Sequence, residues 1–329
     1  MATMFAPIPG IQFKGYIGID SVSVNPPVPI ENTPIEISFQ LTNASYGSLS
    51  GLVRFVGQHE DPKIGPSTYQ VNGLAPGGSV WGKVRGLAPA AGQNQEIDLS
   101  FEPPVKGIPV LGGYKTIDVR ATYRVDVYQL VCHNPRSKNQ DTLIGVCSAF
   151  DDGAPLPPTN PNPQRQFEDQ YGLQTESYGD HGSGSTIPVH FSFEPFDDVP
   201  GEDRDLTFTY IFSNMGGGLG AARQGLQITG HLAAAIGSAA GPIGAAIGGL
   251  IDGILQGISG ILQDCNGQVA SDKFRLHSGD MERITTQGQG HYEQTDSYEG
   301  NPSPGDCGEV SHYDVSWRLS RLSWWYGPV

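Results

Sequence analysis

Apolar and polar residues alternate along two stretches of the first half of the chain, 35–42 and 117–127. A period of two is typical of a strand with one face buried and the other in water. The second run is long for a single strand, so we expect it to bend or to pass from one sheet to another. Similar strand signals recur in the second half, around 189–193, 206–212, 274–276 and 313–319.

These patterns predict a mainly β protein of two β-sandwich units, the second carrying a Gly/Ala-rich helical hairpin insert. Proline, asparagine, glycine and serine concentrate between the two sets of strands and mark a connection. The expected organisation is an N-terminal arm at 1–16, an immunoglobulin-like sandwich at 17–130, a connecting segment at 131–187 and a second sandwich at 188–329, with its insert at 219–263.

The insert is the most unusual part of the sequence, because residues 232–251 contain no charge. Isoleucine, leucine and glycine recur there at helical spacing, and Pro242 divides the segment into two predicted helices, 219–239 and 242–263. Three alternatives stay open: a helical insert packed on the sandwich, a contact between subunits, or a hairpin that inserts into a membrane. The residues expected at this interface are Ile236, Gly241, Ile243, Gly244, Ile247, Gly248, Leu250 and Ile254.

The first unit resembles a known family. The stretches VNPPVPIENTPIEISFQLTNAS and VNGLAPGGSVWGKVRGLAPAAGQNQEIDLSFEPP are similar to the bacterial CARDB group of immunoglobulin-like adhesion modules over residues 17–130. The resemblance implies a β-sandwich with an adhesive or spacer role, and it implies no catalytic residues. The second unit resembles C2-like sandwiches with a helical insert.

Composition narrows the range of partners. The chain carries a net charge of −15, with 45 glycines and 26 prolines among its 329 residues. That charge would repel a phosphate backbone, so nucleic acid is not expected as a partner, whereas a membrane or a glycan remains open. The first twenty residues lack a basic region followed by an apolar run and do not read as a secretory signal, which leaves the localisation unknown and favours the cytoplasm or a signal-independent export route.

Four cysteines could form two disulfides, Cys132 with Cys147 and Cys265 with Cys307, which is one of three possible connectivities. Four reduced thiols are an equal alternative. No pair is spaced as C-x-x-C, which argues against zinc held by cysteines.

Candidate ligand-binding residues are few. Asp197, Asp198 and Asp203 lie in a predicted turn, where grouped carboxylates suit calcium, and a solvated acidic turn is the alternative. The eight histidines are scattered without metal-ligand spacing. Trp324 and Trp325 near the carboxyl end could anchor an interface, fill the second core or stack on a sugar.

The sequence contains no nucleophile elbow, H-E-x-x-H motif, phosphate loop or dinucleotide fingerprint. We therefore expect a non-catalytic binding or self-assembling structural protein that forms homo-oligomers or binds another protein. The alternative function is a membrane-active, pore-forming toxin whose hairpin enters lipid.

Overall fold

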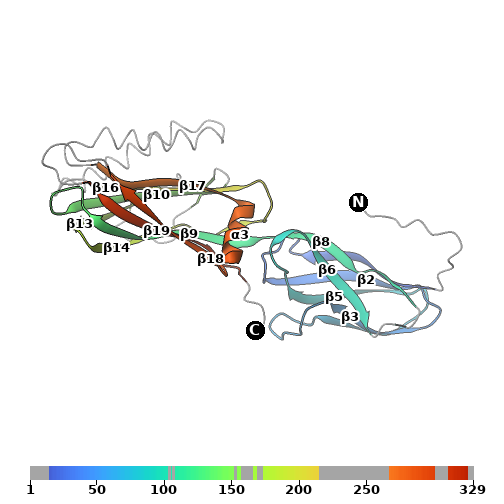
Figure 1. Ribbon diagram of the computed structural model, residues 1–329. Helices are drawn as coiled ribbons and strands as arrows, with labels where there is room; N and C mark the ends of the chain where they lie inside the picture. Colours follow the sequence, from blue (N-terminus) through green and yellow to red (C-terminus); the bar gives the residue numbers. More distant parts are fainter. Residues whose placement is uncertain are drawn as a thin grey trace. The chain divides into compact units, whose positions relative to one another are not determined.

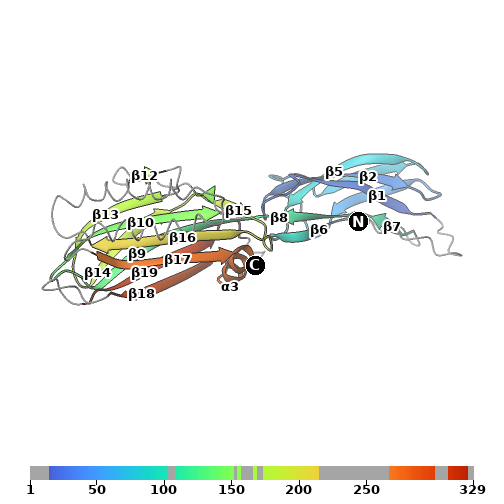
Figure 2. The ribbon, with the colours of Figure 1, turned by 90° about the horizontal axis from the view of Figure 1, so that it is seen from above.

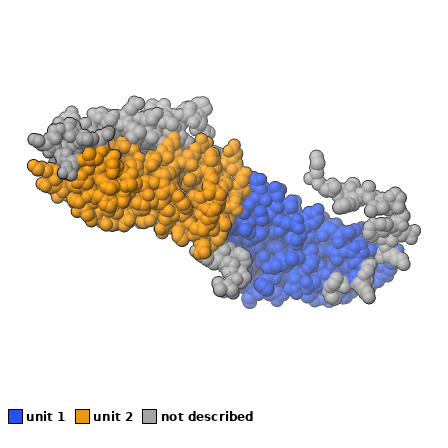
Figure 3. All heavy atoms as spheres, in the orientation of Figure 1, with its two compact units in different colours: residues 1–121, 325–329 blue, residues 122–324 orange. Residues whose placement is uncertain are grey.

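The computed structural model describes residues 15–102, 105, 108–151, 154–156, 166–168, 173–214, 267–300 and 310–324. The chain divides into two compact units, residues 1–121 with 325–329 and residues 122–324, coloured blue and orange in Figure 3. It is mainly β, as the alternation predicts. Its described residues form four sheets and one helix, α3 (Ser278–Gln287).

Unit 1 holds two four-stranded sheets, in the orders β5-β2-β1-β7 and β4-β3-β6-β8. All their neighbours run antiparallel except β1 and β7, which are parallel. The strands are β1 (Ile17–Asn25), β2 (Pro34–Asn43), β3 (Leu49–Phe55), β4 (Thr68–Leu74), β5 (Ser79–Leu87), β6 (Gly92–Glu102), β7 (Val110–Gly112) and β8 (Tyr114–Val119).

The core of unit 1 follows from the period-two pattern of β2. Its apolar residues from Ile35 to Leu41 are almost fully buried, while the polar residues between them stay half-exposed. Phe39 meets Tyr69 of the other sheet edge-on, with ring centroids 5.7 Å apart. The buried faces of the two sheets therefore contact each other.

Unit 2 holds two larger sheets (Figures 1 and 2). One has the order β12-β13-β10-β16-β17, with β11 beside β10; the other has the order β14-β9-β19-β18, with β15 beside β9. The strands are β9 (Ala121–Asn134), β10 (Asp141–Asp151), β11 (Ala154–Pro155), β12 (Gln166–Glu168), β13 (Leu173–His181), β14 (Ser185–Ser192), β15 (Phe196–Asp198), β16 (Asp205–Asn214), β17 (Gly267–His277), β18 (His291–Glu299) and β19 (His312–Arg321).

Aromatic rings fill the space between the two sheets of unit 2. Trp317 on β19 is 1% exposed and lies against Phe208 of β16 and Phe274 of β17, with ring centroids 4.9 and 4.8 Å apart. Phe191 of β14 contacts Phe212 of β16 in the same layer. The sheet that contains β9 and the sheet that contains β10 therefore pack against each other through these aromatic side chains.

The alternating run at 117–127 passes from one sheet to another, as expected. Strand β8 ends in unit 1 at Val119, and β9 begins at Ala121 and continues into unit 2. The backbone of Arg120 between them bonds to Pro29 and Glu31 in unit 1. The unit boundary thus lies near residue 121, not at 130.

The expected connecting segment at 131–187 needs correction, because it contains strands of unit 2. Strand β10 pairs with β13 and β16 on its two sides and is buried along most of its length. Sequence patterns signal such a strand weakly, since burial of both faces replaces alternation with a continuous apolar run. The second unit therefore begins near residue 122 and not at 188.

The predicted helical hairpin at 219–263 lies outside the described residues. Among the helices that the structure describes, none is both long enough and apolar enough to cross a membrane. Helix α3 was not expected. It packs through Met281 and Thr285, one turn apart and both buried, and the Thr285 hydroxyl donates to the Met281 carbonyl oxygen at 2.6 Å.

Candidate functional site

A shallow hollow of about 440 Å³ lies on unit 2, lined by residues of β9 and β14 and by Arg318 of β19. Tyr123, Val125 and Val127 of β9 are buried, whereas Arg124 and Tyr128 are partly exposed. The hollow is therefore on the outer face of the β14-β9-β19-β18 sheet, away from the aromatic core.

Irregular pairing on both sides of β9 shapes this hollow. The register between β9 and β14 shifts between Pro188 and Phe191, and the register between β9 and β19 shifts between Ser316 and Trp317. Both shifts fall opposite Tyr128. Such bulges bend a strand and redirect its side chains, and they are common beside functional sites.

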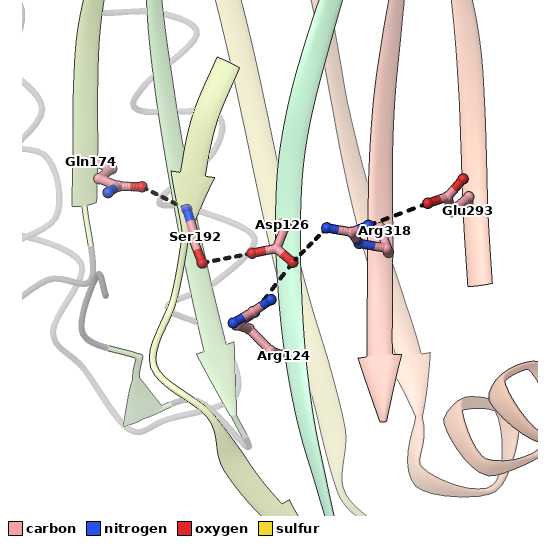
Figure 4. Close-up of polar contacts among 6 residues, drawn as sticks. All are labelled: Arg124, Asp126, Gln174, Ser192, Glu293 and Arg318. Carbon is pink, nitrogen blue, oxygen red and sulfur yellow. Dashed lines mark hydrogen bonds and ion pairs between the residues drawn. The ribbon is translucent and has the colours of Figure 1, made fainter. Parts of the chain in front are cut away.

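Asp126 is the central group of the hollow (Figure 4). Its Oδ1 accepts a hydrogen bond from the Ser192 hydroxyl at 2.6 Å. Its Oδ2 accepts one from Arg124 Nε at 3.3 Å and lies 3.7 Å from Arg318 Nη2. Because the Asp126 side chain is only 10% exposed, these partners hold a largely buried carboxylate between two guanidinium groups.

The network extends over five strands, from β13 through β14, β9 and β19 to β18. On one side, Gln174 Oε1 of β13 accepts from the Ser192 backbone N–H at 3.1 Å. On the other, Arg318 Nη1 donates to Glu293 of β18 at 3.4 Å, and the Arg318 guanidinium lies over the Tyr128 ring, 5.5 Å from its centroid. Packing and charge together therefore fix the position of Arg318.

The arginines retain unused hydrogen-bonding capacity. Within the described part of the chain, Arg124 has no partner beyond Asp126, and Arg318 Nε is buried without a hydrogen-bond acceptor. Each side chain is exposed by a little over a third. The hollow thus offers guanidinium N–H groups to an oxygen acceptor, and planar carboxylates match that geometry best.

The same geometry does not arrange an activated nucleophile. His190 and Ser192 lie on one face of β14, but His190 Nδ1 pairs with Glu176 of β13 at 3.3 Å. The Ser192 proton is directed at Asp126 and not at the imidazole. A serine nucleophile needs a base that takes its proton and is itself oriented by a third group.

The three candidate calcium ligands do not converge. Asp197 accepts a hydrogen bond from the Thr122 hydroxyl at 2.7 Å, Asp198 turns inward and is 1% exposed, and Asp203 is exposed in the following turn. Neighbouring residues of a strand point to opposite faces, which separates Asp197 from Asp198. The calcium interpretation is therefore corrected: no group of possible metal ligands in the described residues includes these three.

Arg204 supplies the positive charge in this region. It forms ion pairs with Asp151 and with Asp198, the latter at 3.8 Å, and donates to the Asp197 carbonyl oxygen at 3.2 Å. Burial nevertheless raises the pKa of Asp198 to about 6, outweighing the Arg204 charge. Neither Asp198 oxygen has a hydrogen-bond partner in the described residues.

The candidate disulfide between Cys132 and Cys147 is not formed. Both residues are buried free thiols, Cys132 on β9 of one sheet and Cys147 on β10 of the other. Burial raises the pKa of both thiols. The alternative of reduced thiols holds for this pair, while Cys265 and Cys307 lie outside the described residues.

The tryptophans near the carboxyl end divide between two environments. Trp317 fills the core, whereas Trp324 is half-buried, with the Arg321 guanidinium 5.1 Å from its ring centroid. Trp325 and the expected interface residues of the insert, from Ile236 to Ile254, lie outside the described residues.

Sequence reasoning missed the hollow. Arg124 and Asp126 were visible as polar positions of a predicted strand, but Ser192 is 66 positions away from Asp126 and no local motif links them. Searches with family models and among curated proteins match nothing, so neither supplies a signal for the site.

Proposed function

We propose that the protein is a non-catalytic, self-assembling binding protein, and that the hollow around Asp126 binds an acidic segment of a second copy. The observation that carries this proposal is the pair of arginines on β9 and β19, both beside the Asp126 carboxylate and both exposed by a little over a third. A rigid pair of this kind can bind a carboxylate with two parallel hydrogen bonds.

Charge favours a second copy as the occupant. The chain has 34 acidic residues against 19 basic ones, so every copy presents more carboxylates than it can pair. Glu202 and Asp203 are examples of exposed acidic residues in unit 2. Because like charges otherwise keep copies apart, we expect association where the two guanidinium groups can bind a carboxylate of another copy.

The finer architecture belongs to the same proposal. We infer that each unit is a β-sandwich, since aromatic contacts join the two sheets within unit 1 and within unit 2. The outer faces of a β-sandwich suit binding and assembly, because paired strands hold the exposed side chains on a rigid surface. The membrane-active alternative depends on residues 219–263, outside the described part, and stays a prediction.

Light scattering after size-exclusion tests the proposal. We expect association that weakens as salt rises, because exposed charge pairs are screened. Arg124→Gln and Arg318→Gln should each weaken it by about tenfold or more, the range expected for a lost charge-assisted hydrogen bond. Arg283→Gln is the matched control, since Arg283 is exposed on α3 and pairs only with Asp280 among the described residues.

Two outcomes would contradict the proposal. One is a monomer at all concentrations and salt conditions. The other is an oligomer that both hollow variants leave unchanged while their melting temperatures match the original protein. A glycan or an unrelated protein as the true occupant would give either result.

A further inference from the structure

Two histidines and one aspartate from distant parts of the sequence meet on unit 2. His133 lies on β9, and His312 and Asp314 lie two positions apart on the neighbouring strand β19. His133 Nε2 is 2.7 Å from Asp314 Oδ2, and His312 Nε2 is 3.8 Å from Asp314 Oδ1. One candidate ligand atom from each residue lies within 4.8 Å of the other two.

A shift in strand register brings the three side chains onto one face. His312 pairs with Asn134 and Tyr313 pairs with Cys132, so His133 has no opposite residue on β19. Cys132 and Tyr313 are fully buried, while His133, His312 and Asp314 all reach the solvent side. A residue inserted in this way is turned by the local bend of its strand, here towards His312 and Asp314.

We propose that His133, His312 and Asp314 form a binding site for a divalent transition metal ion, with zinc as its representative. Two imidazoles and a carboxylate are ligands that Zn²⁺ and its neighbours prefer, and three protein ligands leave a position for water. The inference is independent of the hollow around Asp126 and of the proposed function.

The distances fit such an ion. With bonds of about 2.1 Å and tetrahedral geometry, two ligand atoms on zinc lie about 3.4 Å apart. The observed separations, 2.7 Å from His133 to Asp314 Oδ2 and 3.8 Å from His312 to Asp314 Oδ1, lie on either side of that value but end on different carboxylate oxygens, so an ion requires the side chains to rotate. The strands themselves are paired along their length and hold the three residues together.

The surroundings also suit a cation. Asp314 Oδ1 is buried without a hydrogen-bond partner in the described residues, and an ion on His312 Nε2 would displace the Ser297 hydroxyl, which lies 2.9 Å from that nitrogen. The exposed fractions of His133 and His312, 42% and 37%, leave an entry path for the ion.

Titration of the full chain with Zn²⁺ and Co²⁺, followed by calorimetry and by visible absorption, tests the site. We expect one ion per chain, a Co²⁺ spectrum of nitrogen and oxygen ligands, and a higher melting temperature with Zn²⁺. His312→Ala and Asp314→Asn should each weaken binding by more than about tenfold. His277→Ala is the matched control, because His277 also pairs with an aspartate, Asp205, but has no second histidine in its group.

Absence of binding to the original protein would overturn the proposal. So would unchanged binding in both site variants, or thiolate absorption bands with Co²⁺, which would place the ion on cysteines. If one variant fails to fold, as judged by circular dichroism without metal, His133→Gln provides a third change in the same group. Binding that survives in a folded His133→Gln variant also rejects the site.

Discussion

At the scale of single residues, burial decides what a polar group does in this protein. Asp126 and Asp198 are both largely removed from water, yet they differ in their partners. Asp126 accepts hydrogen bonds from Ser192 and Arg124, whereas Asp198 has only the ion pair with Arg204 at 3.8 Å among the contacts of its two oxygens. A carboxylate that is desolvated without hydrogen bonds favours its neutral form.

This difference predicts how stability depends on pH. The pKa of Asp198 rises from 3.8 to about 6 on folding, so between those values the folded state keeps a proton that the unfolded state has lost. The contribution of Asp198 to stability is therefore largest below about pH 4 and is lost as the pH rises through 6. Asp198→Asn should raise the melting temperature at pH 7 relative to the original protein.

Melting curves between pH 4 and 7 check this prediction. The difference between the two proteins should grow across that window and level off above it. Asp280→Asn serves as the control, because Asp280 is exposed on α3 beside Arg283. A variant that is less stable than the original protein at pH 7 would show that the Arg204 ion pair outweighs desolvation.

At the scale of elements, close approach between strands and aromatic rings sets what each position tolerates. Gly145 lies in the middle of β10, paired with Glu176 of β13 and Phe212 of β16. A Cβ atom there would stand 2.7 Å from the Phe212 ring and 3.0 Å from the Tyr178 ring. Since Phe212 is fully buried, its ring cannot move aside without disturbing the core.

Gly145→Ala should therefore destabilise the protein by about 1–3 kcal/mol, the usual cost of overpacking a core. Gly279→Ala is the contrasting change, because its Cβ would meet nothing within 4 Å at the start of α3. Alanine favours a helix over glycine by up to about 1 kcal/mol, so this variant should be slightly more stable. Urea unfolding of both variants measures the two effects, and equal stabilities would contradict the packing argument.

At the scale of the whole molecule, the chain has two separate cores. Phe39 anchors the core of unit 1 against Tyr69, and Phe208 anchors that of unit 2 against Trp317 and Phe274. Each core is built from sheets within its own unit. Units of this size with their own cores commonly unfold as separate cooperative transitions.

Core truncations should consequently act on one unit at a time. Phe39→Ala is expected to lower the stability of unit 1 by about 3–5 kcal/mol, and Phe208→Ala that of unit 2 by a similar amount. Hydrogen exchange resolved by peptide separates them, because β2 and β16 report on different units. Equal loss of protection in both strands from either change would mean that the units unfold together.

The sequence by itself determined the mainly β character and much of the strand positions. The alternation at 35–42 survives folding because one face of β2 must leave water while the other stays in it. The sequence pattern predicts the position of β10 less well, because both faces of that strand are buried and the alternation is lost. It does not predict helix α3, because the few buried residues of this short helix give little periodic signal.

The candidate sites were decided only by the tertiary structure. Asp126 meets Ser192 across 66 positions and His133 meets Asp314 across 181, in each case through pairing of strands that are far apart in the chain. Strand register and its bulges determine which side chains share a face, and a local pattern carries no information on either. Conversely, Asp197 and Asp198 are adjacent in sequence and are parted by the fold, because the pleat turns neighbouring residues to opposite sides of β15.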